Sequence, residues 1–303
     1  MTDPRRFAAA LARGPILLDA GMGTRLIGMG LDPSRADSAS WTLRYPDLVF
    51  SVHRVDARAG ADAVLTNTFT AHVGRSARDM DVLCRDAVAL AREAVGPSKL
   101  VLGSLGPRDD DSYATQARAL ADAGADALIL ETHDAARALL ALPTVREVAA
   151  LPVLVSVYRW DDADSASGRA GRLLEAGAAA LGVNCTNGPD EAIALLERVG
   201  SEPGVPLLAK PNAGPPGWPA IRPGRLAAAV PRLLAMGVRL IGGCCGTTEA
   251  HLAALRRALD RAARDSAPSP WERGEEGRCF EDDGPFNPPG DCGSIERNDD
   301  PRG

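Results

Sequence analysis

The sequence predicts an α/β protein, a single (β/α)8 TIM barrel, over residues 1–265. The first observation is an alternation of eight short apolar runs with helical patterns, which is the count for a closed parallel barrel. The second is that the runs are almost continuously apolar, as parallel strands covered on both faces are. The third is a glycine before four of the runs, which suits the left-handed end of a helix. These glycines are Gly60, Gly124, Gly177 and Gly237.

The N-terminal residues 1–13 lack the apolar core of a signal peptide, and we interpret them as a short capping helix. The first four expected strands follow, and three of them finish with polar side chains. Asp19 lies near the end of the first strand, Asn67 and Thr68 end the second, and Glu131 ends the fourth. These strands cover residues 15–20, 63–68, 100–104 and 127–131.

The last four expected strands also lead to residues that are unusual after an apolar run. Asn184 ends the sixth strand and is followed by Cys185, Lys210 ends the seventh, and a Gly-Gly pair joins the eighth to Cys244 and Cys245. These strands cover residues 152–157, 180–184, 206–210 and 238–242. Strands of about five residues carry such side chains to one end of the sheet, the carboxyl end where barrel enzymes place their catalytic residues.

A second region is expected after the barrel. Residues 266–303 are rich in Pro, Gly, Asp, Glu and Arg and show no periodic apolar pattern, so we predict a disordered or loosely attached tail. Cys279 and Cys292 lie in it. We interpret them as isolated thiols, with a second metal site or a disulfide as the alternatives.

Composition narrows the class of protein. The chain has 303 residues, 45% of them hydrophobic, and a net charge of −6, which argues against a nucleic acid or an anionic membrane as the partner. No apolar run approaches the roughly 18 residues of a membrane span. Six cysteines are too few for a disulfide scaffold, so a reducing, cytoplasmic location is expected, with Cys84 as an inert core thiol. A homo-oligomer is compatible with this composition.

The adjacent cysteines predict a metal site. A disulfide between neighbours is strained, because consecutive Cα atoms lie closer together than a disulfide prefers. Two reduced thiols beside a cation are the simpler interpretation, and Cys185 supplies a third sulfur at a neighbouring strand end. Three thiolates around tetrahedral zinc leave one position open, as in catalytic zinc sites, with copper(I) or an iron cluster as alternatives. None of the four histidines has ligand spacing with another.

Six short segments carry a more specific signal. They are residues 19–24 (DAGMGT), 59–69 (AGADAVLTNTF), 130–132 (LET), 182–186 (GVNCT), 211–214 (PNAG) and 242–248 (GGCCGTT). In this order they resemble the zinc-dependent homocysteine S-methyltransferase family, from about residue 17 to residue 255. The resemblance implies a (β/α)8 barrel in which Cys185, Cys244 and Cys245 bind zinc and the sulfur of homocysteine takes the fourth position.

The resemblance also implies roles for the polar strand ends. Glu131, with Asp19, would bind the ammonium of homocysteine, and backbone N–H groups of the turn that contains Gly23 and Thr24 would bind its carboxylate. The remaining residues would shape the pocket or orient loops around the metal. Asn67 and Thr68 belong to the pocket, and Asn184 and Asn212 to the loops.

The implied reaction is transfer of a methyl group from a small donor to the thiolate of L-homocysteine, which forms methionine. The donor would belong to the S-methylmethionine, S-adenosylmethionine or betaine class. The segments 106–112 and 158–164 are shorter than their usual family counterparts, which leaves the donor open. A partial aromatic surface for a cationic donor is one interpretation of Tyr158, Trp160 and Trp218, and loop anchors are the other.

Two other functions remain open at this stage. One is a binding or sensing protein that keeps the zinc and thiol pocket without methyl transfer. The other is an aldolase-type enzyme, in which Lys210 at the end of the seventh strand forms a Schiff base with a carbonyl substrate.

Overall fold

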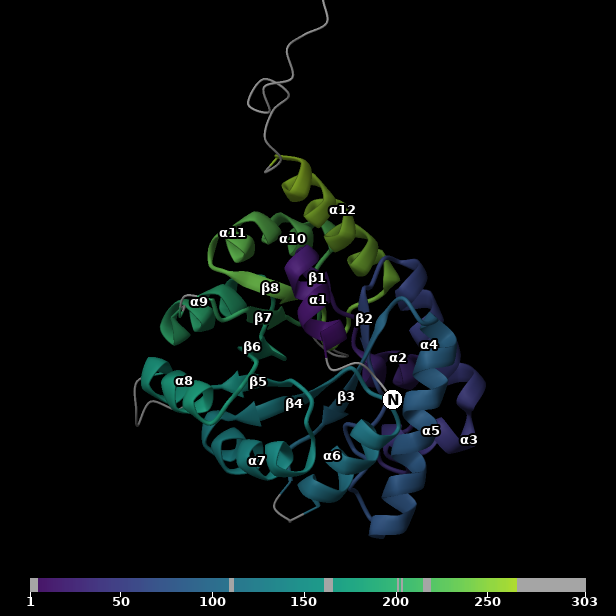
Figure 1. The fold of residues 1–303 in the computed structure, drawn as a ribbon. Coiled ribbons are helices and arrows are strands. Elements are labelled where there is room, and N and C mark those ends of the chain that lie inside the picture. Colours follow the sequence, from purple (N-terminus) through teal and green to yellow (C-terminus); the bar gives the residue numbers. More distant parts are fainter. Residues whose placement is uncertain are drawn as a thin grey trace, which may run out of the picture. The chain divides into compact units, whose positions relative to one another are not determined.

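Eight parallel strands form the centre of the structure, a computed structural model that describes residues 5–265 apart from 109–111, 161–165, 201, 203 and 215–218. Hydrogen bonds join them in the order β1-β8-β7-β6-β5-β4-β3-β2. The strands are β1 (Ile16–Leu17), β2 (Ala63–Leu65), β3 (Leu100–Leu105), β4 (Ala127–Asp134), β5 (Val153–Arg159), β6 (Ala180–Asn184), β7 (Leu207–Lys210) and β8 (Val238–Ile241). Viewed along the barrel, the strands make a ring that the helices surround (Figure 1). The predicted (β/α)8 barrel is therefore confirmed.

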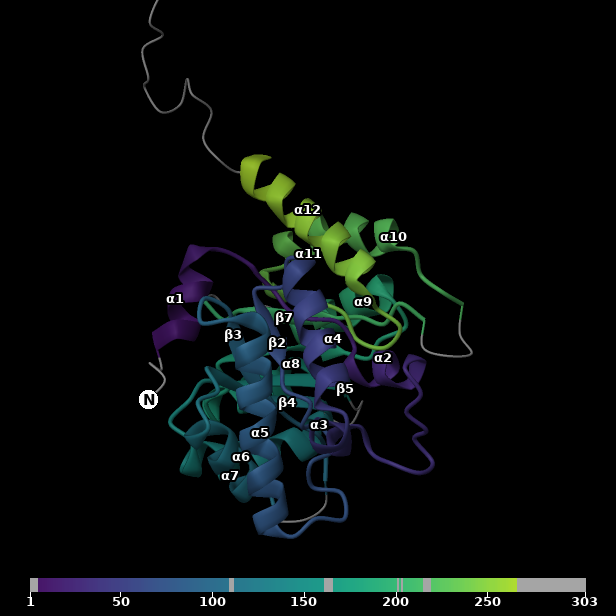
Figure 2. The same ribbon diagram turned by 90° about the vertical axis from the view of Figure 1, so that its right-hand side faces the viewer.

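Helices cover the outside of the ring and one of its ends. The helix before the first strand is present as α1 (Arg5–Arg13), and Figure 2 shows α1 and α2 at opposite ends of the barrel. The others are α2 (Met22–Gly28), η1 (Ser38–Ser40), α3 (Trp41–Arg44), α4 (Pro46–Arg58), α5 (Ala77–Val95), α6 (Tyr113–Asp122), α7 (Ala135–Val148), α8 (Ala166–Glu175), α9 (Pro189–Val199), α10 (Pro223–Ala228), α11 (Val230–Ala235) and α12 (Glu249–Asp265). The short elements α2, η1 and α3 were not predicted. They lie in the long connection from β1 to α4.

Alternation along the strands divides the core in two. Side chains at every second position, such as Leu100 and Leu102 of β3, pack together inside the barrel with Phe7 of α1. The positions between them, such as Val101, pack outward against the helices. This period of two follows from strand geometry. Phe7 thus seals the amino-terminal end of the barrel with an apolar plug, while the carboxyl end stays polar.

The seam between β1 and β2 is closed by aspartate side chains. The amide of Asp62 donates to the carbonyl of Leu17 at 2.7 Å, and the amide of Leu17 donates to the Asp62 carboxylate at 2.8 Å. One layer higher, the amide of Leu65 donates to Oδ2 of Asp19 at 2.7 Å. Carboxylates here stand in for strand carbonyls and satisfy backbone donors that a closed ladder would otherwise pair. Asp19 is therefore part of the barrel wall.

The predicted strand positions agree with the structure, but several bounds differ. The first two strands are shorter than expected, because the chain turns into loops at the carboxyl end of the barrel, and the fourth continues past a bulge to Asp134. No helix within the described ranges is long and apolar enough to cross a membrane. Residues 266–303, with Cys279 and Cys292, lie outside the described residues, so the predicted tail remains a prediction.

Candidate functional site

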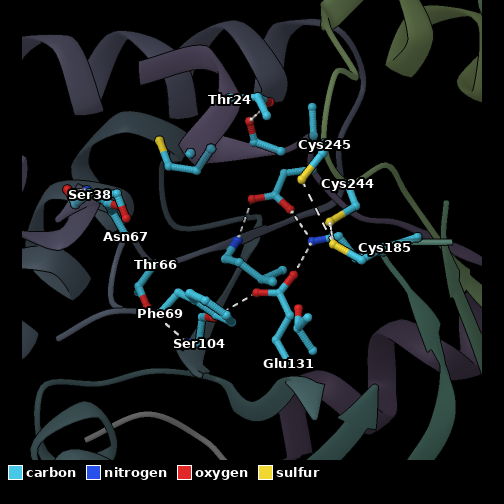
Figure 3. A pocket seen from close by; sticks show the side chains of 18 residues that line it. Thr24, Ser38, Thr66, Asn67, Phe69, Ser104, Glu131, Cys185, Cys244 and Cys245 are labelled. Carbon is cyan, nitrogen blue, oxygen red and sulfur yellow. Dashed lines mark hydrogen bonds and ion pairs between the residues drawn. The ribbon is translucent and has the colours of Figure 1, made fainter. Parts of the chain in front are cut away.

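Three cysteine side chains converge at the carboxyl end of the barrel. Cys185 directly follows β6, and Cys244 and Cys245 lie in the loop after β8. The Sγ atom of Cys185 lies 3.1 Å from that of Cys244 and 3.9 Å from that of Cys245, and all three sulfurs lie within 4.8 Å of one another. Figure 3 shows the three sulfurs pointing toward one another at one side of a cavity.

This cluster fits a metal ion. Ligand sulfurs about 2.3 Å from a tetrahedral zinc are roughly 3.8 Å apart, which lies inside the range of separations found here. The thiols also hydrogen-bond to one another. Hydrogen bonds from Cys185 and Cys244 hold the pKa of Cys245 well below its usual range, while donating to its neighbours raises the pKa of Cys185. One thiolate stabilised by two thiols is a site that a soft cation can enter by displacing protons.

The loop that carries the vicinal pair is held by backbone and side-chain contacts. The amide of Cys244 donates to the carbonyl of Pro211 at 3.0 Å, and that of Cys245 donates to Oδ1 of Asn212 at 2.9 Å. Gly21 packs so closely that a Cβ there would lie 2.4 Å from the Cys244 carbonyl oxygen. Segments that follow two other strands, β1 and β7, thus fix the loop after β8. Asn212 acts on the loop around the cluster, as the resemblance implies.

A charged layer lies beside the sulfurs. Nζ of Lys210 is 3.2 Å from Oδ1 of Asp19 and 3.2 Å from Oε1 of Glu131, and Oε2 of Glu131 accepts from the hydroxyl of Ser104 at 2.8 Å. Burial raises the pKa of Asp19 to about 7 against the opposing charge of Lys210. Burial acts to lower the pKa of Lys210, but the charges of Glu131 and Asp19 more than offset it, and the pKa is raised. Lys210 is therefore a cation in the folded protein.

This layer changes two expectations. A Schiff-base lysine must offer an unprotonated amine, and an ammonium held by two carboxylates does not, so the geometry argues against the aldolase alternative. The resemblance predicts a ligand ammonium at Asp19 and Glu131. In the structure, both carboxylates already contact the ammonium of Lys210.

The cavity beside the cluster has a volume of about 280 Å3. Eight of its lining residues were predicted from the sequence: Asp19, Gly23, Thr24, Asn67, Glu131, Cys185, Cys244 and Cys245. Others were not predicted as pocket residues, among them Ser38, Thr66, Phe69 and Ser104, and Lys210 was considered only as a Schiff-base lysine. Asn67 also donates to the carbonyl of Ser38 at 2.7 Å, which ties the loop after β1 to the cavity wall.

Thr68, predicted to shape the pocket, and Asn184, predicted to orient loops around the metal, both lie behind the cavity wall. The hydroxyl of Thr68 donates to the carbonyl of Ser104 at 2.7 Å, and the residue is fully buried. Asn184 is also fully buried, and its amide donates to Oγ1 of Thr132 at 2.6 Å and accepts from the Thr132 amide at 3.1 Å. Each side chain points toward a neighbouring strand, so neither lines the cavity. Both residues support the site and do not touch the cavity.

The proposed aromatic surface does not line the cavity either. Tyr158 is exposed and Trp160 is buried, and neither borders the cavity. Trp218 lies outside the described residues. Within the described lining, Phe69 after β2 is the aromatic side chain. Its position at the opposite side of the cavity from the sulfurs can be followed in Figure 3.

Comparison with known proteins agrees with this geometry. The family model described as homocysteine S-methyltransferase matches residues 16–259. The chain belongs to the homocysteine S-methyltransferase family. Its fold is similar to that of the homocysteine methyltransferase MmuM from Escherichia coli, with a TM-score of 0.71 and 27% identity for the oxidized form, over 84% of this chain and 99% of that one. The metallated form of MmuM gives a TM-score of 0.68.

Longer relatives match as well. The methionine synthase of Mycobacterium tuberculosis is 30% identical over 262 residues, which cover 72% of this chain and 22% of that protein. The methionine synthase of Mycobacterium leprae is 30% identical over 89% of this chain and 26% of that protein. The chain thus spans about a quarter of the length of these relatives. The similarity concerns that part of each relative, and their full activity is not thereby assigned to this chain.

Proposed function

We propose that this protein transfers a methyl group from a small donor to the sulfur of L-homocysteine, with methionine as the product. The observation that carries the proposal is the convergence of three cysteine sulfurs on a cavity that is also lined by Glu131. The cysteine cluster would bind the sulfur nucleophile, and the carboxylate of Glu131 would bind the head group of the amino acid. The family membership supports the same activity.

Cys185, Cys244 and Cys245 would hold zinc. Bound there, zinc would offer an open position and lower the pKa of a substrate thiol, which is near 8.5 when free, so that a thiolate is present at neutral pH. Methyl transfer to sulfur is an in-line displacement and requires no general base from the protein. The protein's own residues would orient the acceptor. Glu131 and the turn that contains Gly23 and Thr24 are the groups proposed to do so. The first amides of α2 in that turn have no carbonyl one helical turn earlier to bind.

The charge and size of the cavity favour a small cationic donor. Its described lining carries Glu131 and Asp19 with the single cation of Lys210, so it has no net positive charge at neutral pH and becomes net negative as Asp19 ionises above its raised pKa of about 7. Its volume of about 280 Å3 lies below the roughly 300–1,000 Å3 of pockets that bury drug-sized ligands. S-methylmethionine or betaine fits these two properties better than the larger S-adenosylmethionine. Reduced thiols at the cluster further suit a reducing, cytoplasmic setting.

A donor screen tests the proposal. Purified protein loaded with zinc is incubated with homocysteine and each donor class, and methionine is measured by mass spectrometry. We expect methionine with a small sulfonium or betaine donor and none with the Cys245→Ser variant. Turnover that persists in Cys245→Ser freed of metal would refute the zinc-thiolate proposal. Tight homocysteine binding with no transfer from any donor would instead favour the sensing alternative.

A further inference from the structure

A second cavity lies at the amino-terminal end of the barrel, the end where Figure 2 shows α1. It has a volume of about 310 Å3 and borders the first residues of β1 and β3, Ile16 and Leu100. The cysteine cluster follows the opposite ends of the strands, and the two cavities share no lining residue. A ligand held in the second cavity would therefore not touch the cysteines.

Positive charge dominates the lining of this cavity. Arg13, Lys99 and Arg256 border it together with one acidic side chain, that of Asp62, which leaves two positive charges in excess. The whole chain has a net charge of −6, so this excess does not reflect a generally basic protein. The three cations come from the last residue of α1, the residue before β3 and the first half of α12. The attraction of a cation to a helix C-terminus explains only Arg13.

Internal contacts hold two of these cations at consecutive residues of the loop before β2. Nζ of Lys99 donates to the carbonyl of Ala61, and Nη1 of Arg256 lies 3.0 Å from Oδ2 of Asp62. The stem of Arg256 also packs against Gly60, where a Cβ would lie 2.8 Å from its Cγ. Both cationic groups are thus positioned before a ligand arrives, which reduces the entropy lost on binding.

These contacts leave N–H donors unused. An ammonium has three N–H donors and a guanidinium has five. Lys99 uses one of its donors, and Arg256 directs Nη1 to Asp62 and Nε to Asp260, so its Nη2 group has no partner in the described part of the chain. Arg13 is exposed, and no described residue pairs with its side chain. The cavity therefore combines an excess of positive charge with free donors on all three cations.

We propose that this cavity binds a dianionic phosphate group, either free or as the monoester of a small molecule. A phosphate monoester carries about −1.5 to −2 charges at pH 7 and three strong acceptor oxygens, which match two excess positive charges that come from three segments. Guanidinium groups bind phosphate through paired donors. The volume of about 310 Å3 lies at the lower limit of pockets for organic ligands, roughly 300–1,000 Å3, and leaves room for a small ester group. The proposal does not depend on methyl transfer.

A titration followed by 31P NMR tests the site. Reduced full-length protein, freed of metal so that phosphate cannot bind zinc, is added to inorganic phosphate or to glycerol 3-phosphate, and the width of the phosphorus signal reports binding. Sodium chloride at about 150 mM screens distant charges. We expect saturable binding of one phosphate group per chain. Arg13→Gln and Lys99→Gln should each weaken it by about tenfold, the loss of one hydrogen bond to a charged group. Tighter binding of glycerol 3-phosphate would identify a monoester as the ligand, and equal or weaker binding would identify free phosphate.

Arg239→Gln is the matched control. Arg239 is an exposed cation on β8 that borders a different cavity at the same end of the barrel, and its side chain pairs with none of the described residues. Its removal changes the net charge as Arg13→Gln does and should leave the affinity for phosphate unchanged. Neither arginine has a polar contact to lose among the described residues, so this comparison stands even if Lys99→Gln does not fold.

Three outcomes would overturn the proposal. The first is the absence of saturable phosphate binding by the wild type. The second is equal weakening by Arg13→Gln and Arg239→Gln, which would show attraction to the overall charge and not to this cavity. The third is displacement of phosphate by an equal concentration of succinate, because succinate carries its two charges on separate carboxylates.

Discussion

Replacing Asn184 by alanine should loosen the turn that presents Glu131 to the cavity. Asn184 accepts from the Thr132 amide at 3.1 Å and from the Ser156 hydroxyl at 2.7 Å, and it donates to Oγ1 of Thr132 at 2.6 Å. It also approaches Sγ of Cys244 at 3.9 Å. The residue is fully buried, so water does not replace these bonds in the folded protein.

The magnitude follows from the bonds and from backbone strain. Three hydrogen bonds at a net value of about 1 kcal/mol each give roughly 3 kcal/mol, and the weak contact to sulfur adds little. Thr132 has φ of 59°, in the left-handed region that a β-branched residue adopts only under constraint. Two of the three bonds supply that constraint. We expect Asn184→Ala to lower the free energy of unfolding by about 3–4 kcal/mol, a large part of the roughly 5–15 kcal/mol of a typical domain.

A second substitution isolates the strain. Thr132→Gly removes the Cβ that opposes φ of 59° but also loses the Oγ1 bond, so in the wild type the two effects of about 1 kcal/mol should nearly cancel. In Asn184→Ala the Oγ1 bond is already absent. Thr132→Gly should then recover about 1–2 kcal/mol, and the two changes are non-additive.

Urea unfolding of the reduced, metal-free protein measures these free energies without a contribution from metal binding. Ser156→Ala is the matched control, because it removes one bond to Asn184 without touching the Thr132 turn, and it should combine additively with Thr132→Gly. A loss below about 1 kcal/mol for Asn184→Ala, or a Thr132→Gly change that is equal in both backgrounds, would refute the idea that Asn184 holds the strained turn.

Three more predictions concern the metal cluster, a buried histidine and the ion pair. Cys245→Ser should lose bound zinc in a metal analysis by mass spectrometry, whereas the core variant Cys84→Ala, outside the cluster, should retain it. His53 is buried with no hydrogen-bond partner among the described residues, and burial, with the charge of Arg25, lowers its pKa to about 4. The unfolded chain therefore takes up the proton first, and stability should fall as the pH drops from about 6.5 toward 4, by up to about 1.4 kcal/mol per pH unit. His53→Leu should remove this contribution to the pH dependence of the free energy of unfolding, measured by urea titrations at several pH values. An unchanged pH dependence would contradict the prediction. Lys210→Met leaves two carboxylates facing each other and should cost about 3–5 kcal/mol at pH 8 in urea unfolding. The loss should be smaller at pH 5, since Asp19, with a pKa raised to about 7, then takes up a proton, and an equal loss at both pH values would count against the charge layer.

The parts of the fold that could be predicted are those with a local signal. Apolar runs of strand length and the glycines before them locate the eight strands, because burial on both faces and helix ends impose those residues within a few positions. The cysteine cluster could be predicted for a related reason. Parallel strands in a barrel all point one way, so residues that follow β6 and β8 must share one end, and the structure brings Cys185 within 3.1 Å of Cys244.

Side-chain direction could have been predicted further than it was. Interior positions alternate, so Glu131 continues the inward row of Ala127 and Ile129, and Lys210 continues that of Leu208. This rule predicts that Lys210 points into the barrel at the same height as the acidic residues. It could therefore have identified Lys210 as a pocket residue. The left-handed turn at Thr132 had no such signal, since it depends on bonds from Asn184, 52 residues away in the chain.

The seam between β1 and β2 decides what Asp19 does, and no local pattern reveals a seam. The ladder order places β1 and β2 at its two ends, so the Leu65 amide needs an acceptor that strand pairing does not supply, and the Asp19 carboxylate provides it. The same carboxylate neutralises Lys210. Any change at Asp19 therefore acts on barrel closure and on the charge of the cavity together. Loss of activity in an Asp19 variant would follow from either cause, and only variants that keep the charge balance, such as Asp19→Asn combined with Lys210→Met, separate recognition of the acceptor from integrity of the wall.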